Sequence, residues 1–237
     1  MFTLGYNTNG LAHHRLVDAL PMLAKMGYGA VALTPDVGQL DPFNSTAAEV
    51  AHIARLAAEL KLSLVVETGA RFLMDARRKH FPTLLETDAK DRARRLDFLR
   101  RSVDLAQDLG SPLVSIWAGA TPDGSVVGSK ASSAEAHWER LCQGVEALLQ
   151  HARGSGVSIA FEPEPGMFVE RPREYRELLE RLGSAGAELG MTLDVGHLVA
   201  TDDLPVERVI AEFSAQTINV HLDDCPLGVH RHGPFGS

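Results

Sequence analysis

Short apolar runs alternate along the chain with longer stretches of helical periodicity. The amphipathic stretches include AAEVAHIARLAAELK and AEAHWERLCQGVEALLQHA, where apolar residues recur three and four positions apart. This alternation is typical of parallel strands joined by right-handed helical crossovers. The first halves of the apolar runs carry few polar residues, so we expect both faces of the sheet to be covered. The seven strand candidates are residues 2–7, 30–36, 63–69, 112–119, 157–166, 189–197 and 217–224.

Helix ends and loops can also be located. Gly27, Gly110 and Gly183 each follow an amphipathic stretch and suit the left-handed position just beyond a helix. The longest irregular segment runs from residue 70 to residue 87, and loops of this length are usually functional or mobile. No linker rich in proline, glycine or serine divides the chain, so we expect residues 1–237 to form one domain.

Composition narrows the class of protein. A hydrophobic fraction of 45% is typical of a globular protein, and 31 acidic against 23 basic residues argue against general binding to nucleic acid. The two cysteines lie in unrelated types of segment and fit a reducing compartment. Because no signal-like segment and no long apolar run is found, we expect a cytoplasmic protein without a membrane partner.

Polar side chains gather at the carboxyl ends of the strand candidates. Glu67, Trp117, Glu162, Asp194 and His221 each close an apolar run. In a parallel α/β barrel these ends meet at one rim, so residues distant in sequence can form one site. A single carboxylate at a strand end is as well explained by capping of the next helix, but successive ends with Glu, Asp and His favour a site.

The residue types predict a metal site. The segment LDVGH places Asp194 at a strand end and His197 in the turn that follows. Carboxylate and imidazole ligands suit Mn²⁺, Mg²⁺, Co²⁺ or Zn²⁺, and the lack of cysteine in this set favours an open, catalytic type of site. We therefore expect a divalent metal ion as cofactor.

The motifs IAFEPEPG, MTLDVGH and NVHLDD, in this order, resemble those of the xylose isomerase-like TIM barrels. That superfamily contains sugar and sugar-phosphate isomerases and epimerases together with endonuclease-IV-like enzymes. The resemblance implies a TIM-type (β/α)8 barrel, with Glu162, Asp194 and His221 as metal ligands and Glu162 also as a catalytic carboxylate. His197 is similar to the histidine that contacts substrate in isomerases or binds a further zinc in the endonucleases.

The chain departs from this pattern at its carboxyl end. Family members supply another metal-binding Glu from strand eight, after a glycine-rich stretch like HGPFG, and the chain stops before that position. We therefore expect a barrel of seven strands, incomplete at the C-terminus. Either the gene product is longer, or a partner or bound solvent takes the place of the missing group.

Three functions remain open at this stage. The first is a metal-dependent isomerase or epimerase acting on a small sugar, sugar phosphate or related hydroxy-carbonyl compound through an enediolate. The second is a zinc phosphodiesterase on abasic DNA, which His230 and His232 favour and which Glu67 and Trp117 disfavour, since they replace two expected histidines. The third is a barrel that binds a metal or metabolite without turnover.

Other residues are candidates for substrate contact or for a second metal. Arg71 at the rim suits a phosphate or carboxylate, or else makes a surface ion pair. Trp117 suits stacking on a sugar or simple packing. The remaining candidates are Glu164 and Arg231 for substrate, and His197, His230 and His232 for an additional metal. The expected partners are a carbohydrate-like substrate and, as an open alternative, a second copy of the chain.

Overall fold

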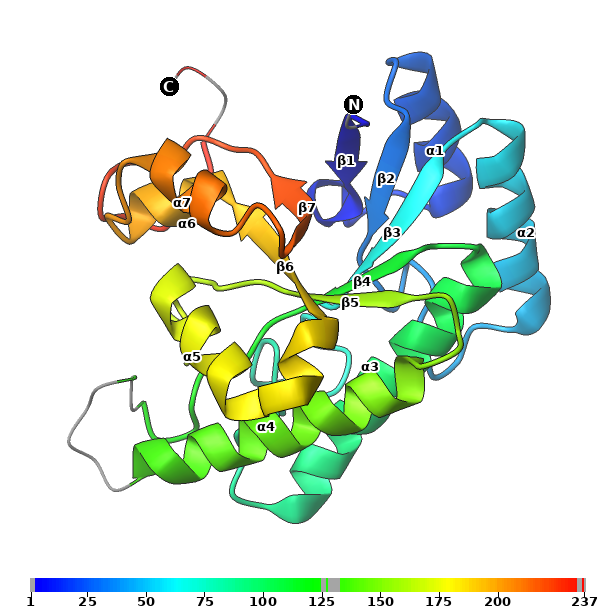
Figure 1. Ribbon diagram of the computed structural model, residues 1–237. Coiled ribbons are helices and arrows are strands. Elements are labelled where there is room, and N and C mark those ends of the chain that lie inside the picture. The colour runs from blue at the N-terminus through cyan, green and yellow to red at the C-terminus, as the bar shows by residue number, and fades with distance from the viewer. Residues whose placement is uncertain (1–2, 125–126, 128–132, 234–235, 237) are drawn as a thin grey trace. The chain divides into compact units, whose positions relative to one another are not determined.

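The computed structural model describes residues 3–124, 127, 133–233 and 236, and within them each of the seven expected strands is present (Figure 1). All seven lie inside the predicted ranges, and their order in the sheet follows their order in the chain, as the barrel prediction requires. The strands are β1 Gly5–Asn7, β2 Ala30–Leu33, β3 Ser63–Glu67, β4 Leu113–Ile116, β5 Ser158–Phe161, β6 Leu189–Asp194 and β7 Thr217–His221.

Helices follow the strands as the periodicity predicts. Gly27 and Gly110 have φ angles of 95° and 69°, as predicted for the left-handed position just beyond a helix. Gly183 has φ 56° with ψ −123°, which is outside the left-handed helical region, so the expected left-handed end is wrong for this glycine. No helix among the described residues combines the length and apolar character that crossing a membrane requires. The helices are α1 Leu16–Lys25, α2 Ala47–Glu59, α3 Ala89–Leu109, α4 Ser133–Ala152, α5 Pro172–Leu182, α6 Val195–Ala200 and α7 Val206–Glu212, with the 3₁₀ helices η1 Thr8–Leu11 and η2 Gly183–Glu188.

The chain packs as two compact units. Unit 1 contains residues up to Pro82 with Arg94–Val114 and His151–Ser158, and unit 2 contains Thr83–Ala93, Ser115–Gln150 and residues from Ile159 onward. The expectation of a single domain over residues 1–237 stays a prediction. The residues expected to bind metal all belong to unit 2.

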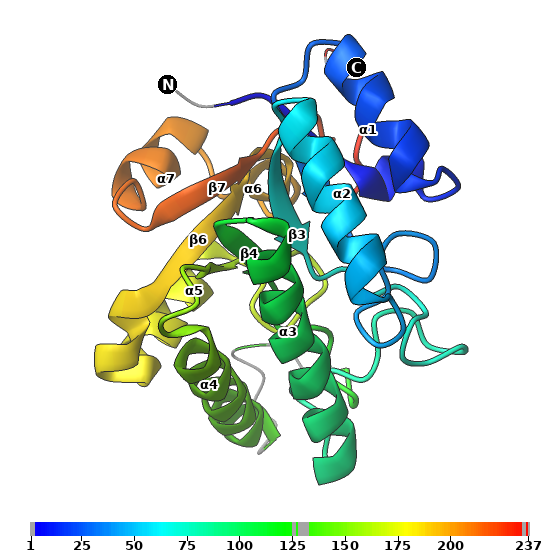
Figure 2. The same cartoon turned by 90° about the vertical axis from the view of Figure 1, so that its right-hand side faces the viewer.

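Unit 1 is built on the parallel strands β1, β2 and β3, with Tyr6 beside Val31 and Val31 beside Leu64. Helices α1 and α2 run side by side along these strands (Figure 2). Each helix buries an apolar stripe with a spacing of three or four residues, because this spacing places side chains on one helical face. Helix α2 begins with a capping box, in which Thr46 and Glu49 satisfy each other's backbone amides.

Unit 2 carries the parallel strands β5, β6 and β7. Thr192 pairs with Asn219 and Asp194 pairs with His221 across β6 and β7. The expectation that both faces of every strand are covered is wrong for β7, where Ile218 and Val220 are each 49% exposed. The short helix α7 buries none of its own residues, so it does not form the apolar layer that covers such a strand elsewhere.

Candidate metal centre

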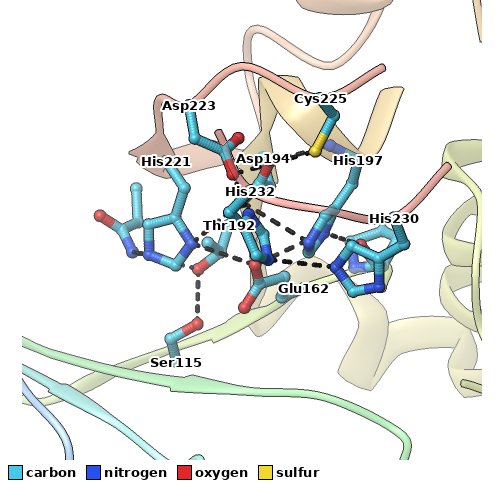
Figure 3. Close-up of polar contacts among 12 residues, drawn as sticks. Ser115, Glu162, Thr192, Asp194, His197, His221, Asp223, Cys225, His230 and His232 are labelled. Atoms are coloured by element: carbon cyan, nitrogen blue, oxygen red, sulfur yellow. Dashed lines mark hydrogen bonds and ion pairs between the residues drawn. The ribbon is translucent and has the colours of Figure 1, made fainter. Parts of the chain in front are cut away.

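The site forms because side chains two positions apart on a strand share one face. Thr192 and Asp194 face the same side of β6, and Asn219 and His221 face the same side of β7. Glu162 follows directly after β5, where its backbone amide donates to the Ile116 carbonyl at 2.7 Å. The strand ends thereby bring Glu162, Asp194 and His221 together (Figure 3).

These three side chains converge on one point. His221 Nδ1 lies 3.0 Å from Glu162 Oε1 and 3.6 Å from Asp194 Oδ2. One ligand atom from each of the three residues lies within 4.8 Å of the other two. Glu162 and Asp194 are only 7% and 6% exposed, so little water competes for their oxygens. Two carboxylate oxygens and one imidazole nitrogen match the ligands that Mn²⁺, Co²⁺ and Zn²⁺ accept, so the donor set fits a divalent cation.

Asp194 is held in its charged form. Burial alone raises the pKa of its carboxyl group, but the hydrogen bond with His221 and the charges of His197 and His221 outweigh burial. The resulting pKa is about 2. A carboxylate that is ionised at neutral pH needs no proton loss before it binds a cation.

His197 lies next to this group, in the first turn of α6. Its Nδ1 lies 3.1 Å from the Pro163 carbonyl oxygen, and because a carbonyl can only accept, Nδ1 carries the hydrogen. Nε2 therefore keeps its lone pair, and it lies 3.7 Å from Asp194 Oδ2. Burial lowers the pKa of His197, which favours the neutral ring that metal binding requires.

His230 and His232 approach His197 from the segment after β7. The ring centroids of His197 and His230 are 4.8 Å apart, and Nε2 of His230 lies 3.2 Å from Nε2 of His232. The three histidines each place one nitrogen within 4.8 Å of the others. The three residues named as an additional metal group are thus brought together, and their role as ligands stays a prediction.

Asp223, in the NVHLDD motif, and Gly196, in the LDVGH motif, were assigned no role from the sequence. Asp223 pairs with His232 Nδ1 and lies 4.0 Å from the Cys225 sulfur. A Cβ atom on Gly196 would lie 1.9 Å from Asp223 Oδ1, so glycine leaves the space that Asp223 occupies. The bare LDVGH pattern showed a glycine in a turn, but only the folded chain shows what packs against it.

The four substrate candidates have different surroundings. Trp117 is buried at the end of β4, with 6% of its surface exposed, and Arg231 is exposed. Glu164 begins a turn that its carbonyl closes with the Met167 amide at 3.0 Å. In unit 1, Arg71 donates to Asn9 and forms a 3.0 Å ion pair with Asp36. Their contact with substrate stays a prediction.

The family model described as xylose isomerase-like TIM barrel matches residues 20–237. No curated protein matches the chain in sequence.

Several solved structures share the fold at low sequence identity. A xylose isomerase domain protein from Planctomyces limnophilus is 16% identical, with a TM-score of 0.68 over 94% of this chain and 74% of that chain. A D-psicose 3-epimerase crystallised with D-fructose is 14% identical, with a TM-score of 0.75 over 93% and 72%. A 3-keto-D-glucoside 4-epimerase from E. coli is 12% identical, with a TM-score of 0.73 over 94% and 80%.

Proposed function

The chain belongs to the xylose isomerase-like TIM barrel family, and from this premise we propose that it is a divalent-metal-dependent isomerase or epimerase of small sugars. The observation that carries the proposal is the convergence of Glu162, Asp194 and His221 at the ends of three neighbouring strands. The strand ends of such barrels are where catalytic groups gather. The sugar epimerases with the same fold support a small carbohydrate as substrate.

Glu162, Asp194 and His221 would hold the cation. When bound, a divalent ion would polarise the carbonyl and hydroxyl oxygens of a hydroxy-carbonyl substrate and make the adjacent C–H group more acidic. The three side chains would hold the ion through one oxygen of each carboxylate and one imidazole nitrogen. This role requires that Asp194 be ionised and that Nδ1 of His221 be free of its hydrogen.

Glu162 is the group we assign to proton transfer. Glu162 is only 7% exposed, so few water molecules reach the oxygen that would take up the proton. In the reaction, the C–H bond beside the carbonyl breaks, the proton passes to a Glu162 oxygen, and the electron pair moves toward the carbonyl oxygen. Return of the proton to the former carbonyl carbon, with the proton of the adjacent hydroxyl group moving to the former carbonyl oxygen, gives isomerisation. Delivery of a proton by another acid to the opposite face of the carbon that lost its hydrogen gives epimerisation, and Glu162 then gives its proton to solvent.

His197 lies between the proposed cation ligands and the pair His230 and His232. We propose that it binds a second divalent cation with His230 and His232, or contacts the substrate if only one cation is held. Its Nε2 lone pair suits either role, because the Pro163 carbonyl fixes the hydrogen on Nδ1. Trp117, Glu164 and Arg231 are our candidates for contact with the sugar.

Deuterium exchange tests the reaction directly. Protein loaded with Mn²⁺ is incubated with ketoses in deuterated water, and deuterium at the carbons next to the carbonyl is followed by NMR. We expect exchange with the wild type and its loss in Glu162→Gln, which keeps the size of the side chain but not its basicity. The same protein is offered abasic DNA.

Each alternative has its own result. Nicking of abasic DNA without exchange would support the phosphodiesterase and overturn the isomerase. Absence of both reactions, with the cation bound, would support a binding protein. Failure of the wild type to bind any divalent ion would overturn the cation site itself.

A further inference from the structure

Beneath the candidate metal centre lies a layer of polar side chains. Ser115 and Thr192 are 1% and 0% exposed, in the interior layer where barrels usually place branched apolar residues. Their hydroxyl oxygens lie 2.8 Å apart, and Asn219 Nδ2 lies 3.3 Å from Thr192 Oγ1. Buried polar groups cost stability unless they are paired, so this layer requires a physical reason.

Asn219 links this polar layer to His221. Asn219 Nδ2 lies 3.4 Å from His221 Nε2, and the opposite ring nitrogen, Nδ1, lies 3.0 Å from Glu162 Oε1. An amide NH₂ group can only donate, so Nε2 accepts and the ring hydrogen is on Nδ1 in a neutral imidazole. In this arrangement Nδ1 donates to Glu162.

Binding of a cation at the proposed site would reverse these roles. If His221 held a cation through Nδ1, the hydrogen would leave this nitrogen, and a neutral ring would carry it on Nε2. That hydrogen needs an acceptor, which the carbonyl oxygen of Asn219 supplies once the amide turns by half a rotation. The hydroxyl groups of Thr192 and Ser115 can each donate or accept, so the hydrogen bond between them can reverse with the amide.

We propose that Asn219 is a positioning residue that selects the His221 tautomer, with Thr192 and Ser115 as its reversible hydrogen-bond partners. The inference rests on the proposed cation site. It explains why two hydroxyls and an amide occupy an interior layer: valine in place of Thr192 would fill the space but could not follow the turn of the amide.

The tautomer is measured first, without metal. Two-bond ¹⁵N correlation spectra at about pH 9, where an ordinary imidazole is neutral, report which ring nitrogen carries the hydrogen. The His221 signals are identified by their loss in His221→Gln. We expect Nε2 to carry no hydrogen in the wild type and to carry one in Asn219→Asp, because the carboxylate introduced beside Nε2 only accepts.

Affinity is measured second, by calorimetric titration with Zn²⁺ near neutral pH. We expect Asn219→Leu, which has similar volume but no acceptor, to bind Zn²⁺ about 10 to 100-fold more weakly than the wild type, as for other groups that orient a ligand. Asn219→Asp should bind at least as tightly as the wild type. Ser115 is one hydrogen-bond partner further from His221, so Ser115→Ala should lose less Zn²⁺ affinity than Asn219→Leu. Val220 is on the outward face of β7, and Val220→Ala should bind Zn²⁺ as tightly as the wild type.

Two results would overturn the inference. One is an Nε2 that still carries no hydrogen in metal-free Asn219→Asp, and the other is wild-type Zn²⁺ affinity in Asn219→Leu. If Asn219 had only a structural role, Asn219→Asp and Asn219→Leu would not differ in Zn²⁺ affinity in this way. If the leucine variant does not fold, the tautomer in the aspartate variant still decides. Wild-type protein that takes up no Zn²⁺ would refute the proposed cation site, whereas the metal-free tautomer tests Asn219 by itself.

Discussion

The side chain of Asp194 accepts a hydrogen bond from the backbone amide of His197, with 2.9 Å between Oδ1 and the nitrogen. Its other oxygen, Oδ2, lies 3.6 Å from His221 Nδ1. One carboxylate therefore caps helix α6 and faces the proposed cation. The cap keeps the side chain in one rotamer, so the second oxygen is already oriented before any ligand binds.

The two roles of Asp194 can be separated by substitution. Asp194→Asn keeps an oxygen for the cap but loses the charge, whereas Asp194→Ala loses both. We expect both variants to lose tight Mn²⁺ binding in calorimetric titrations. In urea unfolding of the metal-free proteins, the alanine variant should be less stable than the asparagine variant by about 1 kcal/mol, the usual worth of an N-cap. Stoichiometric Mn²⁺ in Asp194→Asn would contradict the ligand assignment.

The second group of histidines predicts a second bound cation. Native mass spectrometry with Zn²⁺ should show two ions in the wild type and one in the double variant His230→Ala, His232→Ala, since His197 alone offers a single nitrogen. Arg231→Ala is the matched control, because it changes the residue between the two histidines without removing a ligand. Two ions in the double variant, or one in the wild type, would exclude this second site.

Gly196 predicts a steric coupling with Asp223. Gly196→Ala would place a methyl group 1.9 Å from Asp223 Oδ1 and 3.0 Å from the Cys225 sulfur. We expect it to destabilise the protein by about 1 to 3 kcal/mol, the usual cost of overpacking, although alanine favours helices. Thermal unfolding of Gly196→Ala, Asp223→Ala and the double variant checks this coupling. The double variant should be more stable than the sum of the single effects predicts, and strict additivity would show that the two residues do not collide.

His80 in unit 1 predicts a loss of stability at acid pH. Burial, with the charge of Lys79 next, lowers its pKa from 6.5 to about 4. As the pH falls below the pKa that His80 has in the unfolded chain, the unfolded chain binds a proton at His80 and the folded protein does not. The folded protein therefore becomes less stable until the pH reaches the pKa of His80 in the folded state. Asparagine tolerates the φ of 70° at this position. The melting temperature of His80→Asn should therefore fall less between pH 7.5 and pH 5 than that of the wild type.

The exposed His52 on α2 provides the control for this comparison. His52→Asn should show the same drop in melting temperature as the wild type over this pH interval. An equal drop in His80→Asn would mean that His80 is protonated in the folded state as easily as in the unfolded chain.

Much of the fold and the central residues of the site follow from the sequence. Strand and helix periodicities are local properties, and the placement of polar residues at strand ends follows from parallel topology, so Glu162, Asp194 and His221 could be grouped although 59 positions separate the first from the last. The exposure of Ile218 and Val220 could not be predicted, because an apolar strand looks the same whether or not a helix covers it.

The hydrogen-bond partners of individual side chains could be identified only from the tertiary structure. A serine in β4 and a threonine in β6, 77 positions apart, give no signal that they share a hydrogen bond, because either residue could equally face solvent. The same holds for Arg71, whose charge alone does not reveal that Asp36 and Asn9 accept its hydrogen bonds. Such contacts are set by how strands and loops pack rather than by residue type.

Periodicity along the chain was enough to predict the order of strands and helices. Parallel topology placed polar side chains at the strand ends, and the family resemblance selected the three that meet there. The groups that support them became visible only in the folded chain: Asn219 and Thr192 beneath His221, Asp223 beside His232, and Gly196 beneath Asp223. These partners are chosen by distance and free volume in the folded chain, and neither quantity is contained in the spacing of residues along it.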